Sequence, residues 1–514
     1  MPNPLTSRST ASFLLIFTLT LGAYFRLLLA AQNDFPILDG GLFYAMTTDL
    51  LQNGWRLPLA TTYNYLNIPF AYPPLPFYLL GGVHRLTGID LLILLRWLPP
   101  LISLLILPVF YAMARVMLGS ETLAALATLL FALLPRSWEW LIMGGGITRA
   151  IGTLFFCAFA YGVYQAFHTE KISAAVYAGL WGGLVLLSHP ERALHAATTG
   201  LLFWIWWGRS REGITKAFLL GSLTLAIGAF WWLPLLIHHG WGALLPASQS
   251  GAPRWLFWSL LIQVNFTDET VPLLGLLAIY GLWWSWKEGK QWLAWWLLMM
   301  MATDPRSAPH LLPIPIGLLA ALALAKGIFP LLVQPVRAWE EIFFRRSGQL
   351  FFGYLLILML FNAQSTLLEL QKLVLSQPDR EALAWIVTHT PPQARFLALD
   401  WYSEPTMSPL LEWFPVLAQR TNITTLQGRE WLAGEGHFKV RYQADQELKN
   451  CLYQDISCLQ EWSATYGEKF DYIYLALQAP DGELRRSALG EALRQAPEYQ
   501  LIYQTPQVLI FQRR

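Results

Sequence analysis

Asp39 is the residue of this sequence best suited to proton transfer. It follows the apolar run 12–31, which is long enough to cross the roughly 30 Å hydrocarbon core of a membrane, and it precedes Gly40 and Gly41 in a polar loop. A carboxylate at a membrane surface can act as a general base, because it can accept the proton of a bound hydroxyl group. Alternatively, Asp39 could cap a helix that begins near Leu42, since aspartate is a preferred helix-capping residue.

Further acids, histidines and arginines fall in loops that we expect on the same side of the membrane. Arginine suits phosphate, because its planar guanidinium donates paired hydrogen bonds to two oxygens. Together these residues indicate a site that binds an anion and moves a proton. The candidates are Glu139 as a second catalytic carboxylate, Arg149, Arg192, Arg306 and His310 as the phosphate-binding set, and His189, Glu191 and Tyr72 as further site residues.

Each candidate also has a plainer interpretation. Glu139 lies between two tryptophans, a setting typical of residues that anchor a membrane interface. Arg149 follows three glycines, whose bare backbone lets a ligand approach closely, but it could equally be a buried ion-pair partner. His189 could be a hydrogen-bonded loop residue, and Asp304 could pair with Arg306. These alternatives stay open at the level of sequence.

The composition predicts an integral membrane protein. Hydrophobic residues make up 55% of the 514 positions and charged residues only 13%, which excludes an ordinary soluble globule. A net charge of +2 without a basic stripe argues against nucleic acid as a partner. The first apolar run lacks a clear small-residue cleavage site, so we expect it to be a retained anchor.

Apolar windows predict about eleven transmembrane spans. Basic residues in alternate turns place those turns and the N-terminus in the cytoplasm, provided that the proline-bearing segment 72–86 lies along the membrane face. The candidate loops and everything after residue 368 then lie outside the cell membrane. The expected spans are 12–31, 93–117, 122–136, 147–167, 174–187, 194–207, 217–237, 271–286, 291–301, 311–333 and 350–368.

The tail is a separate domain. Residues 1–370 form the predicted transmembrane catalytic domain, and residues 376–514 an extracytoplasmic α/β domain of ordinary size. This tail lacks a glycine-rich phosphate loop, so no nucleotide cofactor is expected. Its expected elements are helices over 378–389 and 483–494, strands over 395–399 and 472–477, and a hairpin of 499–504 with 507–512.

Cys451 and Cys458 are the two cysteines of the tail. An outer-face domain lies in an oxidising compartment, where a disulfide persists. We therefore expect a structural bridge between them that closes the loop around Gln454 and Asp455.

The order of these features resembles the GT-C glycosyltransferases, a superfamily that includes protein O-mannosyltransferases and aminoarabinose transferases. The most specific matches are Asp39, the run Tyr72-Pro73-Pro74-Leu75 and Glu139, and the run Glu412-Trp413-Phe414-Pro415 is similar to a stretch of related bacterial membrane transferases. The chain lacks the Trp-Trp-Asp-Tyr-Gly motif of oligosaccharyltransferases.

This resemblance implies a multi-pass helical enzyme that moves a hexose or pentose from a polyprenyl-phosphate donor to a lipid, glycan or protein acceptor on the outer face. It implies that Asp39 acts as the general base on the acceptor hydroxyl or helps to hold a divalent metal. Glu139 falls where many relatives carry a second acid.

Two other classes of protein compete with an enzyme. A transporter or lipid flippase would also have many spans, but it is typically built from internal repeats with charges at mid-membrane depth, and we find no repeat here. A non-catalytic assembly protein would not need Asp39. Because the charged residues gather at one membrane face, the sequence favours an enzyme that works there.

Overall fold

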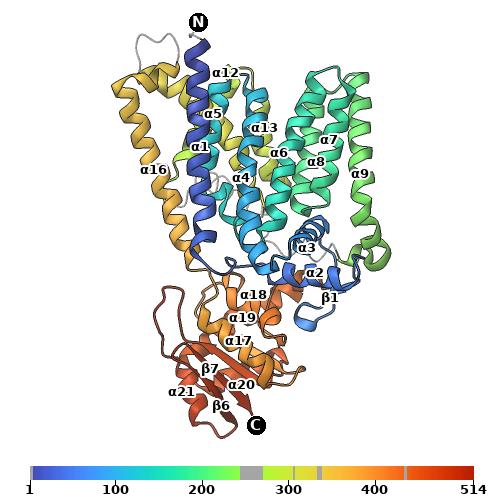
Figure 1. The fold of residues 1–514 in the computed structure, drawn as a ribbon, viewed down its shortest axis with the longest axis vertical. Coiled ribbons are helices and arrows are strands. Elements are labelled where there is room, and N and C mark those ends of the chain that lie inside the picture. Colours follow the sequence, from blue (N-terminus) through green and yellow to red (C-terminus); the bar gives the residue numbers. More distant parts are fainter. Residues whose placement is uncertain (1–3, 244–269, 305–306, 333–338, 433–436) are drawn as a thin grey trace.

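A computed structural model describes residues 4–243, 270–304, 307–332, 339–432 and 437–514. It is a bundle of roughly parallel helices with a small domain at one end (Figure 1). The N-terminus lies at the opposite end of the bundle, so α1 runs towards the small domain (Figure 1).

Each of the eleven ranges predicted as spans corresponds to helix over most of its described residues. Among the described residues, six helical segments are long and apolar enough to cross a membrane, namely α1, α4, α6, α9, α14 continued by α15, and α16; α5, α7 and α13 are shorter apolar helices. Eleven crossings therefore stay a prediction. The helices are α1 (Pro4–Gln32), α4 (Leu91–Leu118), α5 (Glu121–Leu133), α6 (Gly146–His168), α7 (Ile172–Leu186), α8 (Pro190–Trp207), α9 (Arg211–His239), α12 (Leu273–Lys287), α13 (Trp292–Thr303), α14 (Pro313–Leu322), α15 (Phe329–Leu332) and α16 (Arg346–Gln371).

Arg26, the one charged residue of the first apolar run, is buried in the bundle and fully engaged. Its guanidinium donates to the hydroxyls of Ser103 and Ser137 and to the carbonyl of Ala132, at 3.1–3.3 Å. These partners offset the cost of a cation in an apolar interior.

The segment after Asp39 stays at one end of the bundle. Helices α2 (Gly41–Gln52) and α3 (Leu75–Thr87) lie beside the small domain, with a hairpin of β1 (Ala60–Thr61) and β2 (Ile68–Pro69) between them (Figure 1). The 13 residues of α3 extend about 20 Å, which is too short to cross a bilayer. This agrees with the expectation that residues 72–86 do not form a span.

The C-terminal domain begins with α17 (Gln377–His389) and is built on a mixed sheet of five strands in the order β4-β3-β5-β7-β6. Strands β3 (Arg395–Leu399) and β5 (Tyr472–Ala476) are parallel, and β6 (Tyr499–Gln504) with β7 (Val508–Arg513) forms the predicted hairpin. The sequence did not predict β4 (Thr421–Asn422), α18 (Pro409–Leu417), α19 (His437–Lys449) or α20 (Ile456–Tyr466).

The helix expected over 483–494 begins later, as α21 (Ala488–Gln495). The Ser487 hydroxyl accepts a hydrogen bond from the amide of Gly490 and so sets the N-terminus, whereas Leu484 pairs with Gln478 in an isolated bridge. The disulfide between Cys451 and Cys458 is present, with 5.5 Å between the two Cα atoms.

The two parts of the molecule share a buried apolar cluster. It contains Phe35 and Met46 from the first loop region, Phe77 from α3, and Trp413 and Ile510 from the C-terminal domain. The C-terminal domain is therefore packed against the loop that carries Asp39.

Candidate functional site

The loop between α1 and α2 is held against the start of α6. The amide of Gly144 donates to the Ile37 carbonyl at 3.0 Å, and the amide of Gly145 contacts the Asp39 carboxylate Oδ1 at 2.8 Å. A Cβ atom at Gly144 would lie 2.1 Å from the Asp39 carbonyl oxygen, so only glycine permits this approach. Gly40 has a φ of 130°, a conformation that side chains disfavour.

Asp39 does not cap α2. The N-cap of α2 is Gly40, without a side-chain hydrogen bond, so that alternative is wrong for the expected helix. Its carboxylate instead receives the Gly145 amide at the beginning of α6, where the helix dipole favours a negative charge.

Arg149 forms an ion pair with Asp39. Its Nη2 lies 2.7 Å from Asp39 Oδ2, and both side chains retain about a sixth of their surface exposed, at 16% and 17%. Arg149 Nε donates to the Trp140 carbonyl at 2.9 Å, and the guanidinium lies 5.4 Å from the Trp140 ring centroid. The ion-pair interpretation of Arg149 is thus what the geometry shows: the carboxylate of Asp39 and the guanidinium of Arg149 form a partly exposed pair.

Arg192, from the start of α8, contacts α6 at Thr153, one helical turn after Arg149. Its Nε donates to the Thr153 hydroxyl at 3.2 Å, and that hydroxyl donates to the Arg149 carbonyl at 2.8 Å. Arg192 is fully buried, yet its Nη1 and Nη2 make no hydrogen bond to any residue that the structure describes, and Glu191 Oε2 lies 4.0 Å from Nη1. A buried guanidinium with two unused donors is suited to an anion.

Tyr72 and His189 line the same end of α6. The Tyr72 hydroxyl lies 3.3 Å from the Thr148 hydroxyl, and the rings of Tyr72 and His189 meet edge to face at 5.8 Å. A Cβ atom at Gly152 would lie 3.0 Å from the Cβ of His189, so α6 and the start of α8 are closely packed here. The structure therefore gathers Asp39, Tyr72, Arg149, His189 and Arg192 around the first turns of α6.

Other candidates lie outside this group. Glu139 is buried and pairs with Arg136 at 2.7 Å, within the short 3-10 segments that precede α6. The His310 ring packs edge to face against the Trp140 ring, with 5.3 Å between the ring centroids, and the same Trp140 ring contacts the Arg149 guanidinium. Arg306 lies outside the described residues, so its predicted role stays a prediction.

Sequence reasoning missed the contribution of the C-terminal domain. Glu412 is buried against the Asp39 loop, and burial together with the negative charge of Asp39 raises the pKa of its carboxyl group to about 8. Trp431 packs on Tyr72 at 5.9 Å. The run Glu412-Trp413-Phe414-Pro415 was the only signal, and nothing in it pointed to a partner 370 residues away.

The surroundings of Asp39 do not suit a metal ion. Its two carboxylate oxygens engage Arg149 and the Gly145 amide, and an adjacent guanidinium repels a cation. Within the described ranges, no group of three or more histidine, cysteine, aspartate or glutamate residues is placed to bind a metal.

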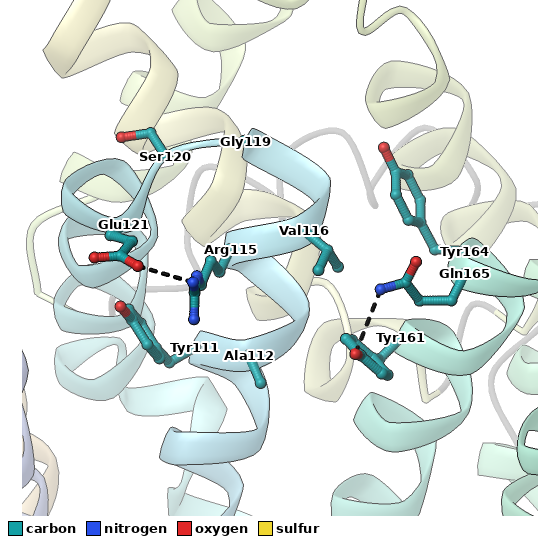
Figure 2. A pocket seen from close by; sticks show the side chains of 10 residues that line it. All are labelled: Tyr111, Ala112, Arg115, Val116, Gly119, Ser120, Glu121, Tyr161, Tyr164 and Gln165. Carbon is teal, nitrogen blue, oxygen red and sulfur yellow. Dashed lines mark hydrogen bonds and ion pairs between the residues drawn. The ribbon is translucent and has the colours of Figure 1, made fainter. Parts of the chain in front are cut away.

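A cavity of about 580 Å³ lies near the far ends of α4 and α6 and is separate from these residues. Figure 2 shows Arg115 paired with Glu121 on one side of it, and Gln165 bonded to Tyr161 on the other. Arg149 and Gln165 are sixteen residues apart on α6, or about 24 Å. This cavity is therefore not part of the site around Asp39.

Comparison with known proteins shows similarity of fold. No protein-family model matches the chain, and no curated protein matches its sequence. Arabinofuranosyltransferase AftD from Mycobacteria is 17% identical, with a TM-score of 0.52 over 96% of this chain and 41% of AftD. The apo structure of ArnT from Cupriavidus metallidurans is 12% identical, with a TM-score of 0.53 over 98% of both chains. The structure of ArnT bound to undecaprenyl phosphate has a TM-score of 0.48.

Proposed function

We propose that this chain, which has the fold of the GT-C glycosyltransferases AftD and ArnT, is itself a membrane glycosyltransferase. It moves a sugar from a polyprenyl-phosphate donor to a hydroxyl group of an acceptor at the membrane face where the C-terminal domain lies. The acceptor is a lipid, a glycan or a protein. The unused donors of Arg192 beside the Asp39–Arg149 pair are the observation that carries this proposal.

In such a reaction the protein performs three tasks. It must place the acceptor, remove its proton and stabilise the departing phosphate. The acceptor oxygen forms a bond to the anomeric carbon of the sugar, and the bond between that carbon and the phosphate oxygen breaks. The phosphate leaves with the electron pair, while the hydroxyl proton passes to Asp39.

The Asp39–Arg149 ion pair links the last two tasks. A carboxylate oxygen has two acceptor positions, so Asp39 can receive a hydroxyl proton while Arg149 and Gly145 hold it in place. Once protonated, Asp39 no longer neutralises Arg149. The freed charge of Arg149 then acts on the phosphate as its own negative charge increases.

Arg192 supplies the fixed part of the phosphate site. Its Nε is anchored to Thr153, so Nη1 and Nη2 are held in place before the ligand arrives, and they need no rearrangement to receive two oxygens. His189 and Tyr72 flank this position as candidate donors to the sugar or phosphate. Glu139 takes no step in this scheme, because it lies outside the group around the first turns of α6, where it is buried and paired with Arg136.

The location of the site supports an interfacial reaction. Helices α2 and α3 lie at the end of the bundle that also carries the C-terminal domain, opposite the N-terminus (Figure 1), and Asp39 directly precedes α2. With the N-terminus in the cytoplasm, as the basic turns predict, this end faces outside the cell membrane. The disulfide of the C-terminal domain fits an oxidising compartment.

A transfer assay tests the proposal. The purified full-length protein in lipid nanodiscs is given undecaprenyl-phosphate-linked pentoses and hexoses together with an envelope extract as acceptor. We expect release of undecaprenyl phosphate and a labelled product. If the protein in vesicles instead moves a fluorescent polyprenyl-phosphate lipid between leaflets without cleaving any donor, it is a flippase.

A further inference from the structure

The amides at the N-terminus of α2 donate hydrogen bonds to a side chain of the C-terminal domain. The amides of Gly40 and Leu42 both donate to Glu412 Oε1, at 3.2 and 3.1 Å. The first amides of a helix have no partner within the helix, and a carboxyl oxygen can satisfy them. Glu412 lies in the first turn of α18 and is 1% exposed, and its second oxygen, Oε2, has no hydrogen-bond partner.

The next residue, Trp413, contacts the same loop on the N-terminal side of Asp39. The indole of Trp413 donates to the Leu38 carbonyl at 2.9 Å, and its ring meets Phe35 edge to face at 4.8 Å. Glu412 and Trp413 therefore contact the residues directly before and after Asp39. A Cβ atom at Gly41 would lie 2.5 Å from the Glu412 carbonyl oxygen, so the two segments are in close backbone contact.

We propose that Glu412 is a positioning residue of the catalytic site, through which the C-terminal domain fixes the loop that carries Asp39. The fixed loop directs the Asp39 carboxylate towards Arg149 and Gly145, 110 and 106 residues further along the chain. A misplacement of about 1 Å at a reacting group can cost about 100-fold in rate, so this support affects catalysis. The catalytic part of this inference rests on the proposed glycosyl transfer.

Glu412 can perform this role as a neutral acid. It is surrounded by Asp39 with its partner Arg149, by the Tyr63 hydroxyl on its own carbonyl at 2.6 Å, and by Glu430. Burial and these neighbouring acids raise its pKa to about 8, so it is largely protonated at pH 7. The oxygen that receives both amides then behaves as a neutral carbonyl acceptor, which the side-chain amide of glutamine reproduces.

The test compares E412A, E412Q and W413F with the parent in nanodiscs. We expect E412A to lower kcat of sugar transfer about 10- to 100-fold, with the donor KM within about threefold. Because glutamine keeps the acceptor oxygen, E412Q should retain at least about a third of the parental kcat. W413F keeps a six-membered aromatic ring and loses the pyrrole part of the indole with its one hydrogen bond, while Glu412 still accepts both amides, so we expect a smaller loss than for E412A. The matched control is E447A, an exposed acid of α19, which should leave kcat unchanged.

Amide hydrogen exchange separates this inference from the proposed reaction. E412A should speed exchange in residues 38–44 while α6 and the C-terminal sheet stay protected, whether or not any sugar is transferred. The positioning role is overturned if E412A has the same kcat and the same exchange rates as the parent. It is also overturned if E412Q is as impaired as E412A. If E412A does not fold, the same criteria apply to W413F and E412Q. If the parent transfers no sugar but E412A still exchanges faster in this loop, the proposed reaction is refuted, whereas the fixing of the loop by Glu412 is not.

Discussion

Replacing Arg192 by methionine should stabilise the protein and weaken donor binding at the same time. The guanidinium is fully buried, and within the described part of the chain its Nη1 and Nη2 make no hydrogen bond. A buried donor without a partner costs about 1–3 kcal/mol, so removal of two gains about 2–6 kcal/mol, and the lost hydrogen bond from Nε to Thr153 costs about 1 kcal/mol. The free energy of unfolding of the ligand-free protein should therefore rise by about 1–5 kcal/mol. Methionine fills a similar volume without polar atoms and so leaves no large cavity.

Donor binding should change in the opposite direction. Each hydrogen bond from a guanidinium to a phosphate oxygen contributes about 1.5–3 kcal/mol, so the loss of two amounts to about 3–6 kcal/mol. Since 1.4 kcal/mol is a factor of ten, R192M should bind undecaprenyl phosphate about 10² to 10⁴ times more weakly than the parent. R192K keeps the charge but loses the two-pronged geometry, and it should fall between R192M and the parent.

The assay pairs chemical denaturation without ligand with titration of undecaprenyl phosphate in nanodiscs. Arg26 provides the matched control, because it is equally buried but donates to Ser103, Ala132 and Ser137. R26M should therefore destabilise the protein and leave the affinity of folded protein for undecaprenyl phosphate unchanged. If R192M behaves like R26M in both measurements, Arg192 is structural and the phosphate site is wrongly placed.

Three further predictions concern other parts of the molecule. Replacing Cys451 and Cys458 by serine should lower the stability of the C-terminal domain by about 2.5 kcal/mol, the entropy value for so short a loop, and free alkylation of both thiols in the unreduced parent would contradict the bridge. An impermeant maleimide should label A464C in α20 on intact cells but should label E170C, in the turn between α6 and α7, only after permeabilisation; the reverse pattern inverts the topology. The raised pKa of Glu412 means that the folded protein keeps a proton that the unfolded chain loses above about pH 4.5, so parental stability should fall relative to E412Q between about pH 4.5 and 8. A stability difference that stays constant with pH would show that Glu412 does not titrate in this way.

The sequence predicted the helices well because a membrane segment is a local property. Each apolar range corresponds to a helix over most of its length, and α3, which the prolines, the two glycines and the His84-Arg85 pair set apart from the expected spans, is a helix of 13 residues. Strands β3, β5, β6 and β7 of the C-terminal sheet were also predicted, helped in β5 by a run of aromatic and β-branched residues, whereas the two-residue strand β4 was not. The late start of α21 was missed because Ser487 was not recognised as a stronger helix N-cap than the polar residues before it.

The sequence predicted several residues of the site but not which of them contact each other. Asp39 and Arg149 were both candidates, yet their contact joins residues 110 positions apart and depends on the close approach of Gly144 to the first loop. Glu412 carried no signal as a partner of that loop, because its contact is made only after the C-terminal domain packs on the bundle. Tertiary packing, which single-sequence patterns do not encode, decided these contacts.

The central claim is that Asp39 is the base of a sugar transfer from a polyprenyl-phosphate donor, and the rate of transfer by D39N measures it most directly. Asparagine keeps the shape and can still accept the Gly145 amide, but it cannot take up the hydroxyl proton. With folding verified by unchanged thermal unfolding, kcat for an undecaprenyl-phosphate-linked sugar should fall about 10² to 10⁴-fold. Transfer by folded D39N within about tenfold of the parent would contradict a role for Asp39 as the base.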